Sequence, residues 1–156
     1  MHFSFGTITP DFQINVDSIK DQFAKLKAWN TPIKKILSFG GWAFSTEPAT
    51  INVFRAGVLP ENREKLASNV AKFITDNGLD GVDFDWEYPG ADDIPDTTPG
   101  TAEDAPSYLE FLKLVKKKLG NKSVSIAAPA SYWYLRNFPI KEISEVVDYI
   151  IYSETF

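Results

Sequence analysis

Three acidic residues alternate with apolar ones in the stretch VDFDWE. Asp83, Asp85 and Glu87 are separated by Phe84 and Trp86. Alternate residues of a β-strand face the same side, so the three carboxylates share one face and span roughly 13 Å at about 3.3 Å per residue. The two aromatic residues then face the opposite side. Burial and mutual repulsion raise carboxyl pKa values, so at least one acid is expected to hold a proton near neutral pH, as a general acid must.

Two other interpretations of this acidic row stay open, namely a divalent-cation site and a structural or solvated row. A calcium loop needs oxygen ligands and a Gly in a tight turn, whereas Val82, Phe84 and Trp86 separate the acids here. Aromatic neighbours also argue against a solvated strand. The spacing favours a buried general acid, with no metal and no cofactor.

The overall composition limits the classes of partner. The 156 residues suffice for a single domain, expected to span 1–156. The net charge of -5 argues against nucleic acid and gives no reason to expect binding to an anionic membrane. No apolar run approaches the roughly 18 residues of a membrane span. The chain has no cysteine, and its one histidine, His2, excludes a multi-histidine metal site.

Helical and strand-like segments alternate along the chain. Apolar spacing predicts helices over 18–29, 61–77, 105–119 and 140–145. Runs rich in Ile, Val and Phe predict strands over 2–8, 35–41, 81–87, 124–130 and 146–152. This order indicates an α/β fold with a parallel sheet and crossover helices. Five strands are too few to close an eight-stranded barrel, so both sheet edges would be bare and could promote association, with the oligomeric state left open.

The segment 89–107, PGADDIPDTTPGTAEDAPS, interrupts this alternation directly after the acidic strand. Its Pro, Gly, Asp and Thr content is typical of a solvated surface loop. In parallel barrels the loops that follow the strands also build the sites. The same segment is therefore a candidate rim of a substrate cleft.

DGVDFDWEYPG (80–90) resembles the D-x-x-D-x-D-x-E signature of glycoside hydrolase family 18, the chitinases and their relatives. SFGGWAFS (38–45) resembles the S-x-G-G motif of the family's third strand, and HFSFGTI (2–8) resembles its second strand. SIAAPASYWYLRNFPI (125–140) resembles the fifth-strand region of fungal members. The likeness extends to about Ile151. It implies a partial (β/α)₈ barrel, roughly strands two to six, truncated at both ends.

The resemblance also implies a reaction and roles for the acids. The substrate would be chitin or another β-1,4-linked N-acetylglucosamine polymer, and Glu87 falls on the catalytic acid that protonates the glycosidic oxygen. Asp85 falls on the carboxylate that orients the acetamido group, whose carbonyl oxygen attacks the anomeric carbon with net retention. Asp83 falls on the inner acid that shares a proton with Asp85. Asp80 and Gly81 fall on the start of the strand, where a structural role is expected.

Six further residues are candidates for substrate binding. They are Tyr88, Gly40, Gly41, Trp42, Tyr132 and Trp133. Tyr88 falls on a position that often lines the sugar subsite in the family. The two glycines would let the backbone approach either the substrate or a neighbouring strand. The other three have rings that suit the apolar face of a sugar, although most aromatic residues of a barrel belong to its core.

Two departures from the family pattern leave three hypotheses for the function. The family's first strand is absent, and the sixth strand, VVDYIIY (146–152), is followed by SETF (153–156) in place of Met-x-Tyr-Asp. In the family that tyrosine positions the acetamido group. The chain is therefore a chitinase-type hydrolase, a non-catalytic relative that binds chitin, or an inactive truncation product.

The resemblance implies an extracellular protein. The segment after Met1 has no basic region and no leader-like apolar core, so no signal peptide is predicted in this chain. Asn121, Lys122 and Ser123 form an N-glycosylation sequon, which matters in a secreted chain.

Overall fold

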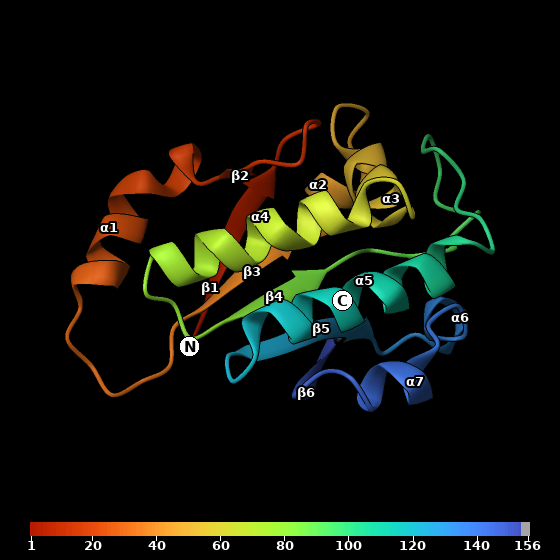
Figure 1. Ribbon diagram of the computed structural model, residues 1–156. Coiled ribbons are helices and arrows are strands. Elements are labelled where there is room, and N and C mark those ends of the chain that lie inside the picture. Colours follow the sequence, from red (N-terminus) through yellow and green to blue (C-terminus); the bar gives the residue numbers. More distant parts are fainter. Residues whose placement is uncertain (154–156) are drawn as a thin grey trace.

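The computed structural model describes residues 1–153, which form one mixed sheet covered by helices (Figure 1). The strands are β1 (His2–Ile8), β2 (Ile14–Asn15), β3 (Ile36–Gly40), β4 (Gly81–Asp85), β5 (Ser123–Pro129) and β6 (Tyr149–Ser153). Their order across the sheet is β2-β1-β3-β4-β5-β6. β2 pairs with β1 antiparallel, and the other neighbouring pairs are parallel. The predicted parallel sheet is therefore confirmed, with β2 as an addition.

The helices connect the parallel strands and vary greatly in length. They are η1 (Asp17–Ile19), α1 (Lys20–Ala28), α2 (Trp42–Thr46), α3 (Ile51–Val58), α4 (Arg63–Asp76), α5 (Asp104–Leu119), α6 (Tyr132–Leu135) and α7 (Ile140–Ser144). The long helices α4 and α5 lie side by side over the sheet (Figure 1). The four predicted helices are present, whereas α2, α3 and α6 were not predicted.

The core lies between the sheet and these helices. Phe39 and Phe84 stand opposite each other in register on β3 and β4, and both are fully buried. The Phe84 ring lies 5.1 Å from the ring of Phe111 on α5, centroid to centroid. Trp86 stacks on Phe54 of α3 at 5.8 Å. The predicted packing of Phe84 and Trp86 on the helix layer is confirmed.

The opposite face of the sheet has a buried polar row. Ser38 of β3, Asp83 of β4 and Ser125 of β5 stand in register, and all three side chains are buried. They alternate with the apolar residues that face the helices, as the two-residue period of a strand requires. The acids of β4 therefore face away from the helices, on the inner side of the curved sheet.

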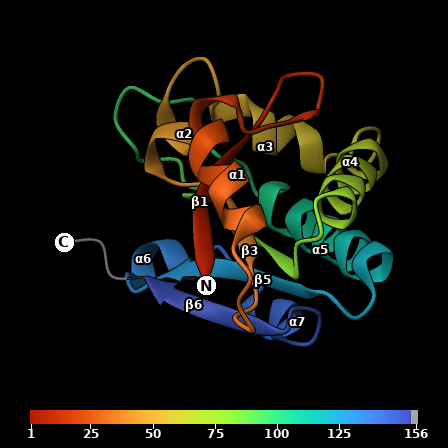
Figure 2. The ribbon, with the colours of Figure 1, turned by 90° about the vertical axis from the view of Figure 1, so that its left-hand side faces the viewer.

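The sheet is open within residues 1–153. Among these residues β6 pairs on one side with β5, and β2 covers β1 at Thr7 and Ile8. The expected partial barrel is therefore confirmed. Figure 2 shows how strongly the sheet curves, since β1 and β6, far apart in the strand order, approach each other. In this part of the chain no helix is both long and apolar enough to cross a membrane.

The predicted departure at the end of the sixth strand falls mostly outside the described residues. Ser153 is the last residue of β6, and residues 154–156 of the SETF segment lie beyond it.

Candidate active site

The acidic row begins inside β4 and continues past its end. Asp83 lies within the strand and is 3% exposed, and Asp85 is the last residue of β4. Glu87 lies in the segment that follows, so the expectation of a strand over 81–87 was wrong at its C-terminal end. The backbone N–H of Glu87 donates to the Ser45 hydroxyl of α2 at 3.0 Å. Helix α2 therefore fixes the position of Glu87, a contact that was not predicted.

The two glycines of the SFGGWAFS segment place β3 tightly against β4. Gly40 has a φ of +112°, and an added Cβ would collide with the carbonyl oxygen of Asp85. Gly41 has a φ of +83°, and its N–H donates to the same oxygen at 2.8 Å. The structure shows the close approach of these glycines to the neighbouring strand, and their role in substrate binding stays a prediction. Both residues thereby support the backbone that presents Asp85.

A cavity of about 230 Å³ lies where the acids emerge from the sheet. It is lined by Trp42, Asp85, Glu87, Tyr88, Ala127, Ala128, Pro129 and Ser153. These residues come from the C-terminal ends of β4, β5 and β6 and from the start of α2, the side on which parallel α/β sheets hold their ligands. The structure therefore brings together four predicted site residues, namely Asp85, Glu87, Tyr88 and Trp42.

Tyr88 and Trp42 have different surroundings in this cavity. Tyr88 is buried, and its ring stacks on that of Tyr134 with centroids 4.5 Å apart. Trp42 is 51% exposed, which leaves much of its indole ring open to solvent. An exposed ring beside two acids is the arrangement that a sugar-stacking platform needs.

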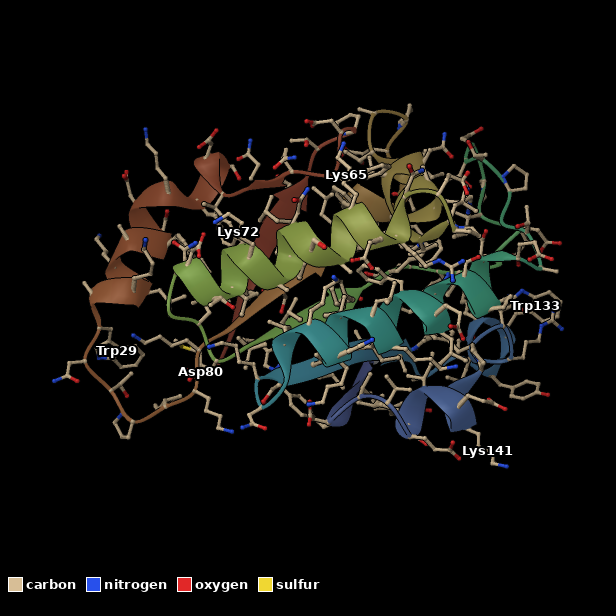
Figure 3. All side chains as sticks on the ribbon, in the orientation of Figure 1. Trp29, Lys65, Lys72, Asp80, Trp133 and Lys141 are labelled. Carbon is tan, nitrogen blue, oxygen red and sulfur yellow. The ribbon has the colours of Figure 1, made fainter. Side chains whose placement is uncertain are left out.

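The other two predicted aromatic residues lie on α6 and outside this cavity. Tyr132 is 78% exposed. The Trp133 Nε1–H donates to the Asp93 carboxylate at 2.6 Å, and the Arg136 guanidinium lies 3.6 Å from the centre of its ring. Trp133 thus links α6 to the loop that follows the acidic strand. Figure 3 shows Trp133 at the opposite end of the molecule from Asp80, which precedes β4.

Burial raises the pKa values of the two acids at the cavity, and neighbouring like charges raise that of Asp85 further. The pKa of Asp85 is raised to about 7 by burial first, and then by the charges of Glu87 and Asp83. Burial also raises the pKa of Glu87, and a hydrogen bond with Tyr88 opposes that rise. Asp85 is therefore about half protonated near neutral pH. Two adjacent carboxyls with raised pKa values can hold and pass a proton at a half-buried site.

Asp83 lies deeper, in the polar row. The Ser125 hydroxyl donates to Asp83 Oδ1 at 2.6 Å, and His2 Nδ1 lies 3.6 Å from Asp83 Oδ2. On the far side of the imidazole, His2 Nε2 lies 2.8 Å from the Tyr149 hydroxyl. His2, Tyr149 and Ser125 were not among the predicted site residues. For Ser38 and Ser125 the sequence contained one indication of a place in the site, because each is a small polar residue in an otherwise apolar strand.

Comparison with known proteins decides the family. The model of the glycosyl hydrolases family 18 matches residues 1–152. The chain belongs to this family. The secreted chitinase LysM12 of Penicillium expansum is 51% identical over 154 residues, which cover 97% of this chain and 10% of that protein. The killer toxin subunits alpha/beta of Kluyveromyces lactis are 49% identical and cover 97% of this chain and 13% of that protein.

Solved structures show the same architecture. The chitinase domain of the spore coat protein CotE from Clostridium difficile is 26% identical, with a TM-score of 0.76 over 96% of this chain and 42% of that one. Catalytic domain 2 of the Ostrinia furnacalis Group II chitinase shares the fold, with a TM-score of 0.84, 21% identity, and coverage of 97% and 41%. This family 18 chain spans 10–14% of the length of three chitinases of Penicillium expansum that it matches.

The family 18 signature also includes residues at the other end of β4. The backbone N–H of Lys35 donates to the Asp80 carboxylate at 2.8 Å, which joins the start of β4 to the start of β3. An added Cβ at Gly81 would collide with the carbonyl oxygen of Ser123. Both positions therefore hold strands together, away from the cavity.

Within residues 1–153 no group of three or more His, Cys, Asp or Glu residues is arranged to hold a metal ion.

Proposed function

We propose that this family 18 chain is the acid-bearing part of a chitinase catalytic domain that hydrolyses β-1,4-linked N-acetylglucosamine polymers. The observation that supports this most strongly is the pairing of Asp85 and Glu87 at one cavity, each with a raised pKa. A general acid must keep a proton until the glycosidic oxygen takes it, and raised carboxyl pKa values serve that requirement. Several relatives are named chitinases, which supplies the substrate class.

In the proposed reaction Glu87 is the general acid. Its proton passes to the glycosidic oxygen while the bond from that oxygen to the anomeric carbon breaks. The carbonyl oxygen of the substrate's own acetamido group bonds to the anomeric carbon and forms an oxazolinium ion. Water then attacks that carbon, gives a proton back to Glu87 and releases the acetamido oxygen. Two displacements at the same carbon leave its configuration unchanged.

Asp85 and Asp83 support this sequence. An ionised Asp85 accepts a hydrogen bond from the acetamido N–H, orients the carbonyl for attack and stabilises the positive oxazolinium ring. For that role Asp85 must lose its proton when substrate binds, and Asp83 is the neighbouring acid that can share it. The raised pKa of Asp85 allows this exchange near neutral pH.

The cavity residues Trp42 and Tyr88 are the proposed contacts for the sugar rings. Trp42 is half-exposed, and the buried Tyr88 lines the cavity beside Glu87. Tyr132 and Trp133 lie outside this cavity and would contact more distant sugars of a long chain. The polymer is extracellular material, and one relative is named a secreted chitinase, so we place the working protein outside the cell.

The test is hydrolysis of an N-acetylglucosamine hexamer by the chain, followed by proton NMR of the anomers. We expect new reducing ends that appear first as the β-anomer. First appearance of the α-anomer would contradict the substrate-assisted mechanism. Saturable binding to chitin beads without any cleavage would favour the non-catalytic binding relative. Neither binding nor cleavage would favour the inactive truncation product, which the open sheet makes a concrete alternative.

A further inference from the structure

The chain's single histidine, His2, lies beside the buried Asp83 and contacts a residue of the distant strand β6. His2 stands at the start of β1 and Tyr149 at the start of β6. His2 Nε2 lies 2.8 Å from the Tyr149 hydroxyl, and the two rings meet edge to face with centroids 5.8 Å apart. The curvature of the sheet brings β1 and β6 toward each other (Figure 2), and the hydrogen bond between His2 and Tyr149 joins these two strands. The hydrogen bond therefore links two residues that are 147 positions apart in the sequence.

The other ring nitrogen of His2 faces the buried acid. Nδ1 lies 3.3 Å from the Ser38 hydroxyl and 3.6 Å from Asp83 Oδ2. Asp83 is almost fully buried, and its other oxygen accepts the hydrogen bond from Ser125. A buried carboxylate is costly unless donors or a basic group compensate for the lost water. Among residues 1–153, His2 is the basic side chain that lies within 4 Å of Asp83.

We propose that His2 is a positioning residue for Asp83, held in place by Tyr149. The Tyr149 hydroxyl donates to Nε2, so the proton of the neutral imidazole resides on Nδ1. The Nδ1–H then faces Ser38 and Asp83 and favours the ionised form of Asp83. The proton that the two aspartates share therefore lies toward Asp85, the position next to Glu87.

The electrostatics of the neighbours agree with this arrangement. The charge of Asp83 is one of the causes that raise the pKa of Asp85, after burial and Glu87. Burial raises the pKa of the Tyr149 phenol, opposed by a hydrogen bond with Ser125, and Asp83 and Asp148 add to the rise. Tyr149 therefore stays protonated and can donate to His2. This inference rests on the proposed function, because Asp83 matters to the reaction through Asp85.

The first test determines the tautomer of the His2 ring by nitrogen-15 NMR. The chain has one histidine, so it gives one set of ring signals. The native chain is expected to show the tautomer with the proton on Nδ1. Tyr149→Phe keeps the ring contact and removes the hydroxyl, so the proton should move toward Nε2, the site preferred by free imidazole. Tyr152→Phe is the matched control, because its hydroxyl bonds to the Ala130 carbonyl on the exposed surface. An unchanged tautomer in Tyr149→Phe would overturn the proposal.

The second test follows the titration of the aspartate carboxyls by carbon-13 NMR, without substrate. His2→Phe removes the partner that favours ionised Asp83, so the shared proton should move toward Asp83 and the titration midpoint of Asp85 should fall by about half a pH unit or more. His2→Asn keeps an amide donor near the place of Nδ1, so the fall in the Asp85 midpoint should be smaller. A midpoint that is the same in His2→Phe and the native chain would overturn the proposal, as a purely structural role predicts.

The two tests separate the possible failures. If His2→Phe does not fold, which loss of dispersed amide signals would show, the milder Tyr149→Phe variant decides the question. Both measurements are made on the full chain in the absence of substrate. A chain that cleaves nothing would therefore refute the proposed function and still answer whether His2 sets the ionisation of Asp83.

Discussion

Three carboxyl groups of the same chemistry occupy three different environments in this chain. Asp83 is buried beside a serine hydroxyl and an imidazole, Asp85 lies at the strand end, and Glu87 is half-buried after the strand. Their proximity and burial make full ionisation costly. The cost falls mainly on Asp85, whose pKa is raised to about 7. Carboxyl groups in such different environments can transfer a proton near neutral pH.

Replacing Asp85 should stabilise the protein at high pH. A carboxyl whose pKa is higher in the folded state stabilises the fold below its unfolded pKa of about 4 and loses that contribution as the pH rises through about 7. Asp85→Asn should therefore raise the free energy of unfolding by about 1–2 kcal/mol at pH 8, less than the full shift would give because the carboxyl is partly exposed.

The measurement is urea unfolding of Asp85→Asn and the native chain at pH 5 and at pH 8. At the lower pH the native carboxyl is protonated and the gain should largely vanish. The exposed Asp92→Asn variant is the control and should show no such pH-dependent gain. A gain of the same size at both pH values would contradict the raised pKa of Asp85.

At the scale of single residues, the acidic site residues could be predicted from the sequence, whereas the side chains that contact them could not. Alternation alone placed Asp83 and Asp85 on one face, because a strand has a two-residue period. The partners His2 and Tyr149 could not be found in this way, because their contact depends on the curvature of the sheet and joins distant residues. The roles of the acids in catalysis remain predictions.

Among the elements, the approach of β3 to β4 is the feature most sensitive to one added carbon. Gly40→Ala combines a positive φ with a collision against the Asp85 carbonyl, so it should cost about 3 kcal/mol or more. Gly78→Ala is the matched control, because Gly78 has a φ of +65° and open space around it, and should cost about 1 kcal/mol. Urea unfolding of both variants measures the difference, and equal losses would refute the tight approach.

A buried ion pair holds the loop that follows the acidic strand. Asp104, 3% exposed, bonds Arg55 at 3.0 Å and accepts hydrogen bonds from the backbone of Gly90 and Thr101. Asp104→Asn leaves the Arg55 charge uncompensated and should cost about 3 kcal/mol. It should also speed proteolytic cleavage of the loop.

The control for this prediction is Glu110→Gln, which removes a solvent-exposed ion pair with Lys113. Its cost should stay below about 0.5 kcal/mol. Urea unfolding and limited proteolysis of the two variants test the assignment. If Asp104→Asn cost no more than the control, the loop would not depend on this pair. None of the residues 89–107 is among those that line the cavity at Asp85 and Glu87, and the exposed residues of this segment fit the interpretation as a solvated loop.

Long periodic helices were predictable and short connecting elements were not. Helices α4 and α5 show clear 3.6-residue spacing with Gly after their ends. Helix α3 buries most of its residues, so its apolar run gives little contrast between faces. The end of β4 was missed because the alternation of acids and aromatics continues two residues past the last strand residue, to Trp86 and Glu87, which have no ladder partner.

The molecule as a whole is an open sheet from a family whose solved members extend well beyond it. This chain covers about two-fifths of the CotE chitinase domain that shares its fold. The outer edge of β6 and the part of β1's outer edge before Thr7 have no ladder partner within residues 1–153, which would favour association through these edges. The sequence predicted this openness from the number of strands. Oligomeric state and domain limits remain predictions.

The sequon at Asn121 is placed where a glycan would leave the cavity free. Asn121 is exposed in the turn before β5, whereas the cavity lies at the opposite, C-terminal end of that strand. If the working protein is extracellular, expression through a eukaryotic secretory route should give a chain that loses mass on treatment with an N-glycosidase. Asn121→Gln should abolish that loss, and Asn137→Gln, outside any sequon, should not. A secreted native chain with no glycan would contradict this prediction.

Turnover of a fluorogenic chitobioside by Glu87→Gln is the measurement that decides whether Glu87 is the general acid. Glutamine keeps the shape of the side chain and cannot give up a proton, so turnover should fall by about 100-fold or more. The exposed Glu142→Gln variant on α7 is the control and should match the native chain. Equal turnover by the native chain and Glu87→Gln would contradict the claim and remove Glu87 from the mechanism.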